Sequence, residues 1–261
     1  MDKQLNLLYF SATNNTSKVV KKVAEGIGQI SKEYNITLPD NRQNELTFNS
    51  DELVIVGVPV YAGRVPKFLR DYFTKVKGNN TKAVFVVVYG NRDYEDSLIE
   101  LRDIFEKNGF VGIAGGAFIG EHSYTTKVAT GRPNNSDLNI ALNFGSKIKE
   151  KINNEDSSLK SIKLAVKGNF PYVEKVPIQI ATPKTTDSCY KCGICAKYCP
   201  MGAIDFDNFK DINASKCIKC CSCIKKCPTG SKVIDSEMFN KFTEGLINNF
   251  GTVTREPEIF I

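Results

Sequence analysis

The sequence of 261 residues has little of two things: it contains one histidine, His122, and no long hydrophobic run. No apolar stretch reaches the roughly 18–20 residues that a transmembrane helix needs, so we expect no membrane span. The first residues, MDKQLNLLYFSATNN, become polar too early for the hydrophobic part of a signal peptide. We therefore expect a cytoplasmic protein. A lone histidine in a loop is more often structural than catalytic, so we assign His122 no catalytic role.

The composition is that of a globular protein, because 41% of the residues are hydrophobic and 25% are charged. These fractions exclude an intrinsically disordered chain, and the length suits one large domain or two smaller ones. The nine cysteines all lie between Cys189 and Cys227. Disulfides are rare in the reducing cytosol, so this concentration of thiols indicates a metal site.

The chain up to Ile152 alternates between strand-like and helix-like patterns. Continuous β-branched runs such as Ala83–Val88 are typical of strands that are buried on both faces of a parallel sheet. This alternation predicts an α/β fold, with a doubly wound sheet of five parallel strands. We expect strands at Leu5–Phe10, Asn35–Leu38, Leu53–Val58, Ala83–Val88 and Phe110–Ile119. We expect helices at Ser17–Ile30, Pro66–Val76, Tyr94–Asn108 and Asp137–Ile152, the last of them capped by Ser136.

The segment after the last of these helices loses the alternation and carries three prolines, Pro171, Pro177 and Pro183. The C-terminal part contains one amphipathic helix, about Ser236–Asn248, and an extended tail that ends EPEIFI. An isolated helix of this length is marginal in water, so we expect this part to dock on a domain. The predicted division is a first domain over 1–158, a linker over 159–185, a cysteine-rich domain over 186–232 and a C-terminal part over 233–261.

The strongest signal is an internal repeat with a spacing of 28 residues. Each copy reads C-x2-C-x2-C-x3-C-P; the first motif is Cys189–Pro200 and the second motif is Cys217–Pro228. This run resembles that of the bacterial ferredoxins with two [4Fe–4S] clusters, small α+β proteins in which the fourth cysteine of each copy binds the other cluster. The resemblance implies that one cluster is held by Cys189, Cys192, Cys195 and Cys227. The other would be held by Cys217, Cys220, Cys223 and Cys199.

A zinc ribbon is the alternative for so many cysteines, but its ligands usually come as separated pairs around a single ion. Two triplets, each followed by a fourth cysteine and a proline, fit iron–sulfur clusters better. The ninth cysteine, Cys221, lies outside the pattern and aligns with Gly193 of the first motif. We expect a bystander thiol there, with a substitute ligand during cluster assembly or damage as the alternative.

A second signal lies in the loop Phe10–Lys18, between the first expected strand and the first expected helix. Hydroxyl and amide groups at a helix N-terminus favour an anion such as phosphate. The loop contains neither G-x-G-x-x-G nor G-K-[ST], so it predicts neither a dinucleotide site nor a Walker loop. An ordinary helix cap by Thr16 or Ser17 is the alternative.

The segment SATNNT in this loop resembles the phosphate loop of the flavodoxins, [TS]-x-T-G-N-T, and departs from it at Asn14, where that family commonly has glycine. Asparagine tolerates a left-handed backbone better than most residues, so the departure weakens the match little. The resemblance implies a flavodoxin-like sheet that binds FMN noncovalently at the carboxyl ends of its strands. The implied phosphate-loop residues are Ser11, Thr13, Asn14, Asn15 and Thr16.

Two further loops fall where the flavodoxin fold holds the isoalloxazine ring of the flavin. They follow the third and fourth expected strands, and a plain surface turn is the alternative for each. We expect Tyr61 or Tyr94 to stack on the ring. The residues assigned to the flavin from these loops are Pro59, Val60, Tyr61, Ala62 and Gly63, and Tyr89, Gly90, Asn91, Arg92 and Tyr94.

The positive charge of the chain also suits these cofactors. The formal net charge is +6, and segment 186–232 carries eight lysines and four aspartates. Nucleic-acid binding is a poor explanation, because the lysines lie between the cysteines and form no stripe with stacking aromatic residues. Two [4Fe–4S]²⁺ clusters with four thiolates each would contribute about −4, and a flavin phosphate about −2. We therefore expect bound anionic cofactors and no nucleic-acid partner.

The whole chain resembles the flavodoxin–ferredoxin fusion proteins of anaerobes. The resemblance implies a low-potential electron-transfer protein that moves electrons between FMN, two [4Fe–4S] clusters and redox partner proteins, either ferredoxins or oxidoreductases. A flavin-dependent reductase of a quinone, a nitro compound or an NAD(P)H-linked substrate is the alternative, and a cluster-bearing sensor is a third hypothesis. The flavin and the clusters could meet within one chain or across a homodimer.

Overall fold

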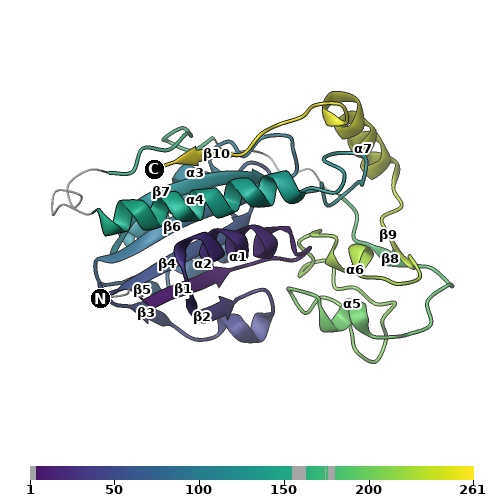
Figure 1. The fold of residues 1–261 in the computed structure, drawn as a ribbon. Helices are drawn as coiled ribbons and strands as arrows, with labels where there is room; N and C mark the ends of the chain where they lie inside the picture. Colours follow the sequence, from purple (N-terminus) through teal and green to yellow (C-terminus); the bar gives the residue numbers. More distant parts are fainter. Residues whose placement is uncertain (1–3, 155–162, 174, 176–179) are drawn as a thin grey trace.

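The computed structural model describes residues 4–154, 163–173, 175 and 180–261. Its largest part is a six-stranded sheet with the strand order β10-β7-β6-β4-β1-β2 (Figure 1). Five of these strands pair in parallel, and β10 runs antiparallel to its neighbour β7. The strands are β1 (Gln4–Tyr9), β2 (Ile30–Asn35), β4 (Glu52–Pro59), β6 (Thr81–Tyr89), β7 (Phe110–Ile119) and β10 (Glu258–Phe260).

The order of the five parallel strands defines the fold. Numbered among themselves along the chain, they lie in the order 2-1-3-4-5, which is the order of the flavodoxin-like doubly wound sheet. Strands β4 and β6 lie in the middle, and their apolar residues are buried on both faces, as the continuous β-branched runs predict. The predicted fold class of the first domain is therefore confirmed. The tail adds the sixth strand, β10, which the predicted five-stranded sheet lacks.

Helices cover both faces of this sheet (Figure 1). On one face α1 (Asn15–Ile27) and α4 (Asn135–Asn153) pack side by side over β1, β4 and β6. They approach closely at Gly26 and Gly145, where an added Cβ would lie 2.1 Å from a backbone carbonyl oxygen of the other helix. The other face is covered by α2 (Lys67–Phe73) and α3 (Ser97–Lys107). A short 3₁₀ helix, η1 (Pro39–Arg42), and a parallel pair, β3 (Leu46–Phe48) and β5 (Val76–Gly78), complete this domain.

Two elements differ from the sequence-based expectation. The second strand occupies Ile30–Asn35, before the expected Asn35–Leu38, and α1 ends earlier, at Ile27. This strand forms an edge of the sheet and its side chains are mostly exposed, so it carries no apolar run for a pattern to detect. Helix α4 is capped by Asn134 and not by Ser136: the Asn134 side chain accepts from the Asp137 N–H, and Asp137 accepts from the Asn134 N–H.

The second domain is small and contains the cysteines. Strand β8 (Lys184–Thr185) pairs antiparallel with β9 (Lys232–Val233), so the last residues of the expected linker form a strand of this domain. Between them lie two one-turn helices, α5 (Ile194–Lys197) and α6 (Ser222–Lys225), one in each cysteine motif. This α+β arrangement is confirmed as the expected class. In Figure 1 the domain lies beside the end of the large sheet where α1 begins.

Two segments tie the domains together. Before the second domain, the Asp96 carboxylate accepts hydrogen bonds from the N–H groups of Asn169 and Val173, both at 2.8 Å. After it, α7 (Glu237–Phe250) leads back to the large sheet, and Asn91 Nδ2 donates to the carbonyl oxygens of Phe250 and Val253. The chain then ends in β10 on the edge of β7. Among the helices of the described residues, none combines the length and the apolar character that crossing a bilayer demands.

Candidate functional site

The loop between β1 and α1 has the geometry of an anion site. Asn14 has a φ of 69°, the left-handed conformation that glycine usually adopts. Within the described residues, the N–H groups of Thr13, Asn15 and Thr16 donate to no protein acceptor, and the hydroxyls of the two threonines make no hydrogen bond. Donors of this kind at a helix N-terminus are suited to phosphate. The loop therefore fits the phosphate of FMN.

A pocket of about 500 Å³ opens beside this loop, at the carboxyl ends of β1, β4, β6 and β7. Its walls combine threonine hydroxyls, tyrosine rings and backbone from four loops, which suits a ligand with a phosphate at one end and an aromatic ring at the other. The predicted flavin residues that line it are Thr13, Asn15, Thr16, Pro59, Val60, Tyr61, Tyr89 and Gly90. Residues 120–123, Ala12, Val88 and Cys220 complete the lining.

Three residues assigned to the flavin from the second ring loop have other contacts. Tyr94 is 1% exposed, and its hydroxyl donates to Glu258 Oε2 at 2.8 Å, so its ring is not available for stacking. Asn91 is held by the segment after α7, as described above, and Arg92 forms an ion pair with Glu95. This loop contributes its first two residues to the pocket, because the others anchor the C-terminal segment and the loop itself. The stacking expectation is thus left to Tyr61.

Four other predicted residues support the loops without lining the pocket. The Ser11 hydroxyl accepts the N–H of Ser17 at 3.0 Å, which fixes the start of α1. Asn14 turns the backbone and lies on the outer side of the loop. Ala62 and Gly63 form a tight turn with φ values of 52° and 80°, closed by paired backbone hydrogen bonds between Tyr61 and Arg64. These residues shape the pocket.

The side of the pocket nearest the cysteines is aromatic. Burial raises the pKa of Tyr61 well above its usual value, and the nearby Cys220 and Tyr124 add to the shift. The rings of His122 and Tyr124 meet edge to face, with centroids 5.4 Å apart. Burial, with help from the charges of Lys225 and Arg92, lowers the pKa of His122 to about 4. The imidazole is therefore neutral at pH 7, and its Nδ1 accepts the N–H of Tyr124 at 3.2 Å.

The cysteines surround two separate cavities. The first has about 320 Å³ of space and is lined by Cys189, Cys192, Cys195 and Cys227. The second has about 350 Å³ and is lined by Cys199, Cys217, Cys220 and Cys223, and also by Cys221. Each cavity thus brings together three cysteines of one motif and the fourth cysteine of the other.

The cysteines around each cavity stand apart from one another. Among the residues that the structure describes, no three His, Cys, Asp or Glu side chains converge closely enough to hold one metal ion. In a [4Fe–4S] cluster each thiolate binds its own iron, so the four cysteines stand apart around the cluster. Backbone N–H groups also reach the fourth cysteines: Ala203 N–H donates to Cys199 Sγ and Ser231 N–H to Cys227 Sγ, both at 3.2 Å.

The two motifs share an unusual backbone. Lys191 and Lys219 have left-handed φ values of 62° and 54°, and at the next equivalent pair Gly193 has 76° and Cys221 has 62°. Cys221 is 2% exposed and packs with Ile180, Ile234 and Phe239. A buried residue in this conformation that is not glycine costs about 1–2 kcal/mol. Its packing under α7 offsets the cost, which agrees with a bystander thiol.

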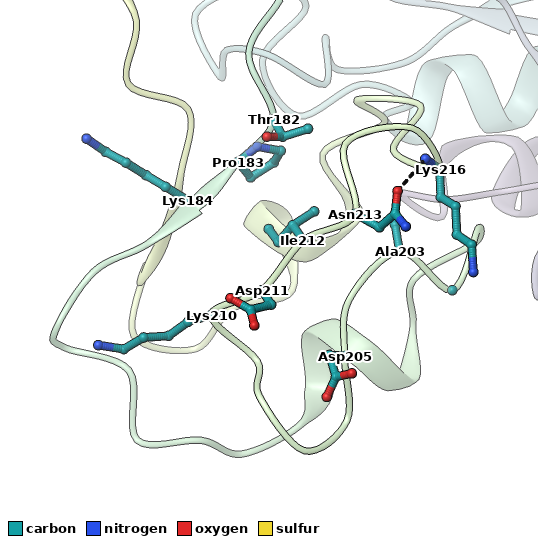
Figure 2. A pocket seen from close by; sticks show the side chains of 11 residues that line it. Thr182, Pro183, Lys184, Ala203, Asp205, Lys210, Asp211, Ile212, Asn213 and Lys216 are labelled. Atoms are coloured by element: carbon teal, nitrogen blue, oxygen red, sulfur yellow. Dashed lines mark hydrogen bonds between the residues drawn. The ribbon is translucent and has the colours of Figure 1, made fainter.

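A hollow on the second domain is open to solvent and is drawn in Figure 2. Pro183, Ala203 and Ile212 also line the second cysteine cavity, so this hollow is the solvent side of that cavity. Its charges are balanced nearby, because Lys184 pairs with Asp235 and Lys210 with Asp187. We assign it no ligand.

Comparison with known proteins found one family match and several similar solved structures. Residues 183–238 match the family model described as a 4Fe-4S dicluster domain. A solved flavodoxin from the domain Archaea is similar over 57% of this chain and 99% of its own, with 13% identity and a TM-score of 0.41. Flavodoxin 1 from Bacillus cereus is similar over 57% and 98%, with 15% identity and a TM-score of 0.40. An NAD(P)H:quinone oxidoreductase from Methanothermobacter marburgensis is similar over 60% and 98%, with 10% identity and a TM-score of 0.38. No curated protein matches the chain.

The chain therefore joins a flavodoxin-like α/β domain to a small domain in which residues 183–238 match a 4Fe-4S dicluster domain. The resemblance to flavodoxin–ferredoxin fusions is confirmed for these two parts, and together they support a redox function. The sequence did not predict that Cys220 would line the pocket beside the phosphate loop, or that Lys225 and Lys226 would contact the loops of this pocket. The repeat held one signal for this: Tyr190 of the first motif corresponds to an apolar Ile218 in the second.

Proposed function

We propose that this protein is an electron-transfer protein that binds one FMN and two [4Fe–4S] clusters and exchanges electrons with redox partner proteins. The observation that carries the proposal is that the pocket beside the phosphate loop and a cysteine cavity share a residue, Cys220. Electron transfer between cofactors requires them to lie close together, and a shared wall provides that. Bound flavin would supply exchange of one or two electrons, and bound clusters would supply exchange of single electrons.

The chain's own residues bind and position these groups. The hydroxyls of Thr13 and Thr16 and the free N–H groups of the loop would hold the FMN phosphate. Tyr61 would pack against the ring, and Pro59, Val60 and Gly90 would shape the space around it. The proposed cluster ligands are the two sets of four cysteines that surround the two cavities. The domain boundaries expected from the sequence belong to this proposal as well.

The test is to purify the full chain without oxygen and to count its cofactors. We expect about eight iron atoms and one FMN per chain, since each cluster holds four irons. Riboflavin, which lacks the phosphate, should bind much more weakly than FMN. Four iron atoms, a single zinc ion, or riboflavin binding as tight as FMN binding would each overturn part of the proposal. Steady oxidation of NAD(P)H by the protein without a partner would favour the flavin-dependent reductase instead.

A further inference from the structure

One cysteine motif is built into the flavin pocket and the other is not. All nine cysteines belong to the described residues, and of these Cys220 alone lines the pocket. Cys220 and its neighbour Ile218 also pack against the main core of the flavodoxin-like domain. On the other side, Tyr124 packs edge to face on Phe239 of α7, in the same apolar cluster as Cys221. The second motif is therefore enclosed between the pocket and α7.

The helix of the second motif also touches the polar loops of the pocket. Lys225 Nζ lies 2.6 Å from Glu121 Oε1. Glu121 in turn is linked to the phosphate loop, because its carbonyl oxygen accepts from Asn15 Nδ2 at 3.2 Å. Lys226 Nζ donates to Asn14 Oδ1 at 3.4 Å. Two positive charges of this motif thus lie beside the loop that is suited to phosphate.

The equivalent residues of the first motif lie in a different environment. Tyr190, the counterpart of Ile218, is 61% exposed, and Cys192, the counterpart of Cys220, is exposed too. Lys197, the counterpart of Lys225, lies over the ring of its own neighbour Tyr198. This motif meets the first domain elsewhere, where Arg42 donates to the carbonyl oxygen of Pro200 at 2.5 Å. Ile194 of helix α5 and Asn14 of the phosphate loop line the same hollow, which is open to solvent.

We propose that the second motif, through residues 217–226, is a wall of the flavin site, so that the flavin and the cluster held by Cys199, Cys217, Cys220 and Cys223 stabilise each other's binding. The cluster held by Cys189, Cys192, Cys195 and Cys227 binds independently of the flavin. Ligation fixes the conformation of the loop that carries Cys220, as metal binding does in other small domains. When the loop is already fixed, flavin binding does not have to order it, so the cluster raises the affinity for flavin. By thermodynamic linkage, bound flavin stabilises the cluster by the same factor. This inference rests on the proposed function.

The main test compares two ligand variants that occupy the same position in the repeat. Cys220→Ala removes a ligand from the flavin-side cluster, and Cys192→Ala removes its counterpart from the other cluster. FMN dissociation constants are measured anaerobically by flavin fluorescence, with iron counted in each sample. We expect affinity for FMN to fall at least tenfold in Cys220→Ala and to stay within threefold of wild type in Cys192→Ala. Equal affinities in the two variants would overturn the inference.

The reciprocal effect gives a second readout that does not involve flavin affinity. The Cys192→Ala variant retains the flavin-side cluster, and Cys220→Ala retains the other one. Iron release to a chelator is followed by absorbance with and without added FMN. We expect FMN to slow iron release from Cys192→Ala severalfold and to leave Cys220→Ala unchanged. Protection of both variants, or of neither, would contradict reciprocal coupling.

A ligand variant could also disrupt the folding of the second domain, so a pair of variants that keeps every cysteine is needed. Ile218→Asn places a polar group in the contact with the first domain, and Tyr190→Asn makes the matched change at the exposed position. Both should retain the full iron content. We expect weaker FMN binding in Ile218→Asn alone. If wild type holds eight irons and one FMN while both variants bind FMN equally, the inference fails and the proposed function stands. If wild type binds no FMN, the proposed function itself fails.

Discussion

The two cysteine motifs have the same spacing and nearly the same backbone, yet they lie in different surroundings. Both place a lysine in the left-handed conformation two residues after the first cysteine, and both place three cysteines around a cavity. The first motif leaves Tyr190 and Cys192 at the surface. In the second motif, Ile218 and Cys220 pack against the core of the flavodoxin-like domain. The two motifs therefore share the arrangement of their cysteines, and the residues between the cysteines decide which surface each motif contacts.

The largest expected effect is a difference in iron content between variants of two adjacent cysteines of the second motif, Cys220 and Cys221. Cys220→Ser should lose about half of the iron, because one of two clusters loses a thiolate. Cys221→Ser should keep nearly all of it, since Cys221 occupies the position of Gly193 in the first motif. Iron analysis and the absorbance spectrum of anaerobic samples measure both. Equal iron loss would show that the ligand register of the second motif is wrong.

The next effect concerns the packing that encloses only the second motif. Phe239 of α7 is 9% exposed and packs on Tyr124 and Cys221. Phe239→Ala should lower the free energy of unfolding by about 3–5 kcal/mol, the usual cost of removing a buried phenyl ring. Met238→Ala is the control, because Met238 is 53% exposed. Denaturant unfolding measures both, and an equal loss in the two variants would contradict the enclosing role of α7.

Substitutions in the phosphate loop should weaken FMN binding and leave the iron content of both motifs unchanged. Removing a hydrogen bond to a charged group costs about 1.5–3 kcal/mol, so Thr13→Ala and Thr16→Ala should each weaken FMN binding roughly ten- to hundredfold. Thr47→Ala, at an exposed position of β3, should leave the affinity unchanged. Fluorescence titration gives the dissociation constants, and the iron content should be that of wild type throughout. Unchanged affinity in both loop variants would mean that the loop only caps helix α1 and does not bind the phosphate of FMN.

His122, in the pocket wall beside the second motif, should make the free energy of unfolding depend on pH. Burial lowers the folded-state pKa of His122 from 6.5 to about 4, so the unfolded chain takes up a proton first as the pH falls. Stability is therefore full above pH 6.5 and decreases toward pH 4. At 1.36 kcal/mol per unit, the loss at pH 5 is about 2 kcal/mol. Unfolding of wild type and His122→Gln at pH 7 and pH 5 measures this contribution. A wild-type loss no larger than that of the variant would contradict it.

The smallest expected effect is on stability, in variants of the two equivalent residues with a left-handed backbone, Gly193 and Cys221. Gly193→Ala should cost about 1 kcal/mol, because its φ of 76° disfavours any side chain. Cys221→Gly should change stability less, since relief of the same strain is offset by the loss of buried contacts. Thermal unfolding resolves differences of this size. A larger loss in Cys221→Gly would mean that its thiol contributes more than packing.

Much of the fold was predictable because its signals are local. The buried runs of β4 and β6 and the spacing of the cysteines depend on residues that are near in sequence. The exposed edge strand β2 was misplaced for the opposite reason, because it lacks an apolar run. Strand β10 was missed because three residues at the chain end form a strand only when β7 offers an open edge.

The candidate site also has one part that local sequence signals predict and another part that they do not. The sequence by itself was enough to predict the two sets of cysteines and the phosphate-loop residues Thr13 and Thr16, since these predictions depend only on residue type and spacing. Only the tertiary structure decided that Tyr94 bonds to Glu258 and leaves the pocket, and that Cys220 enters it. Both outcomes depend on contacts between segments that are far apart in the chain; Tyr94 and Glu258 are separated by 164 positions. Contacts of this range are selected by the packing of whole elements, and no local pattern encodes them.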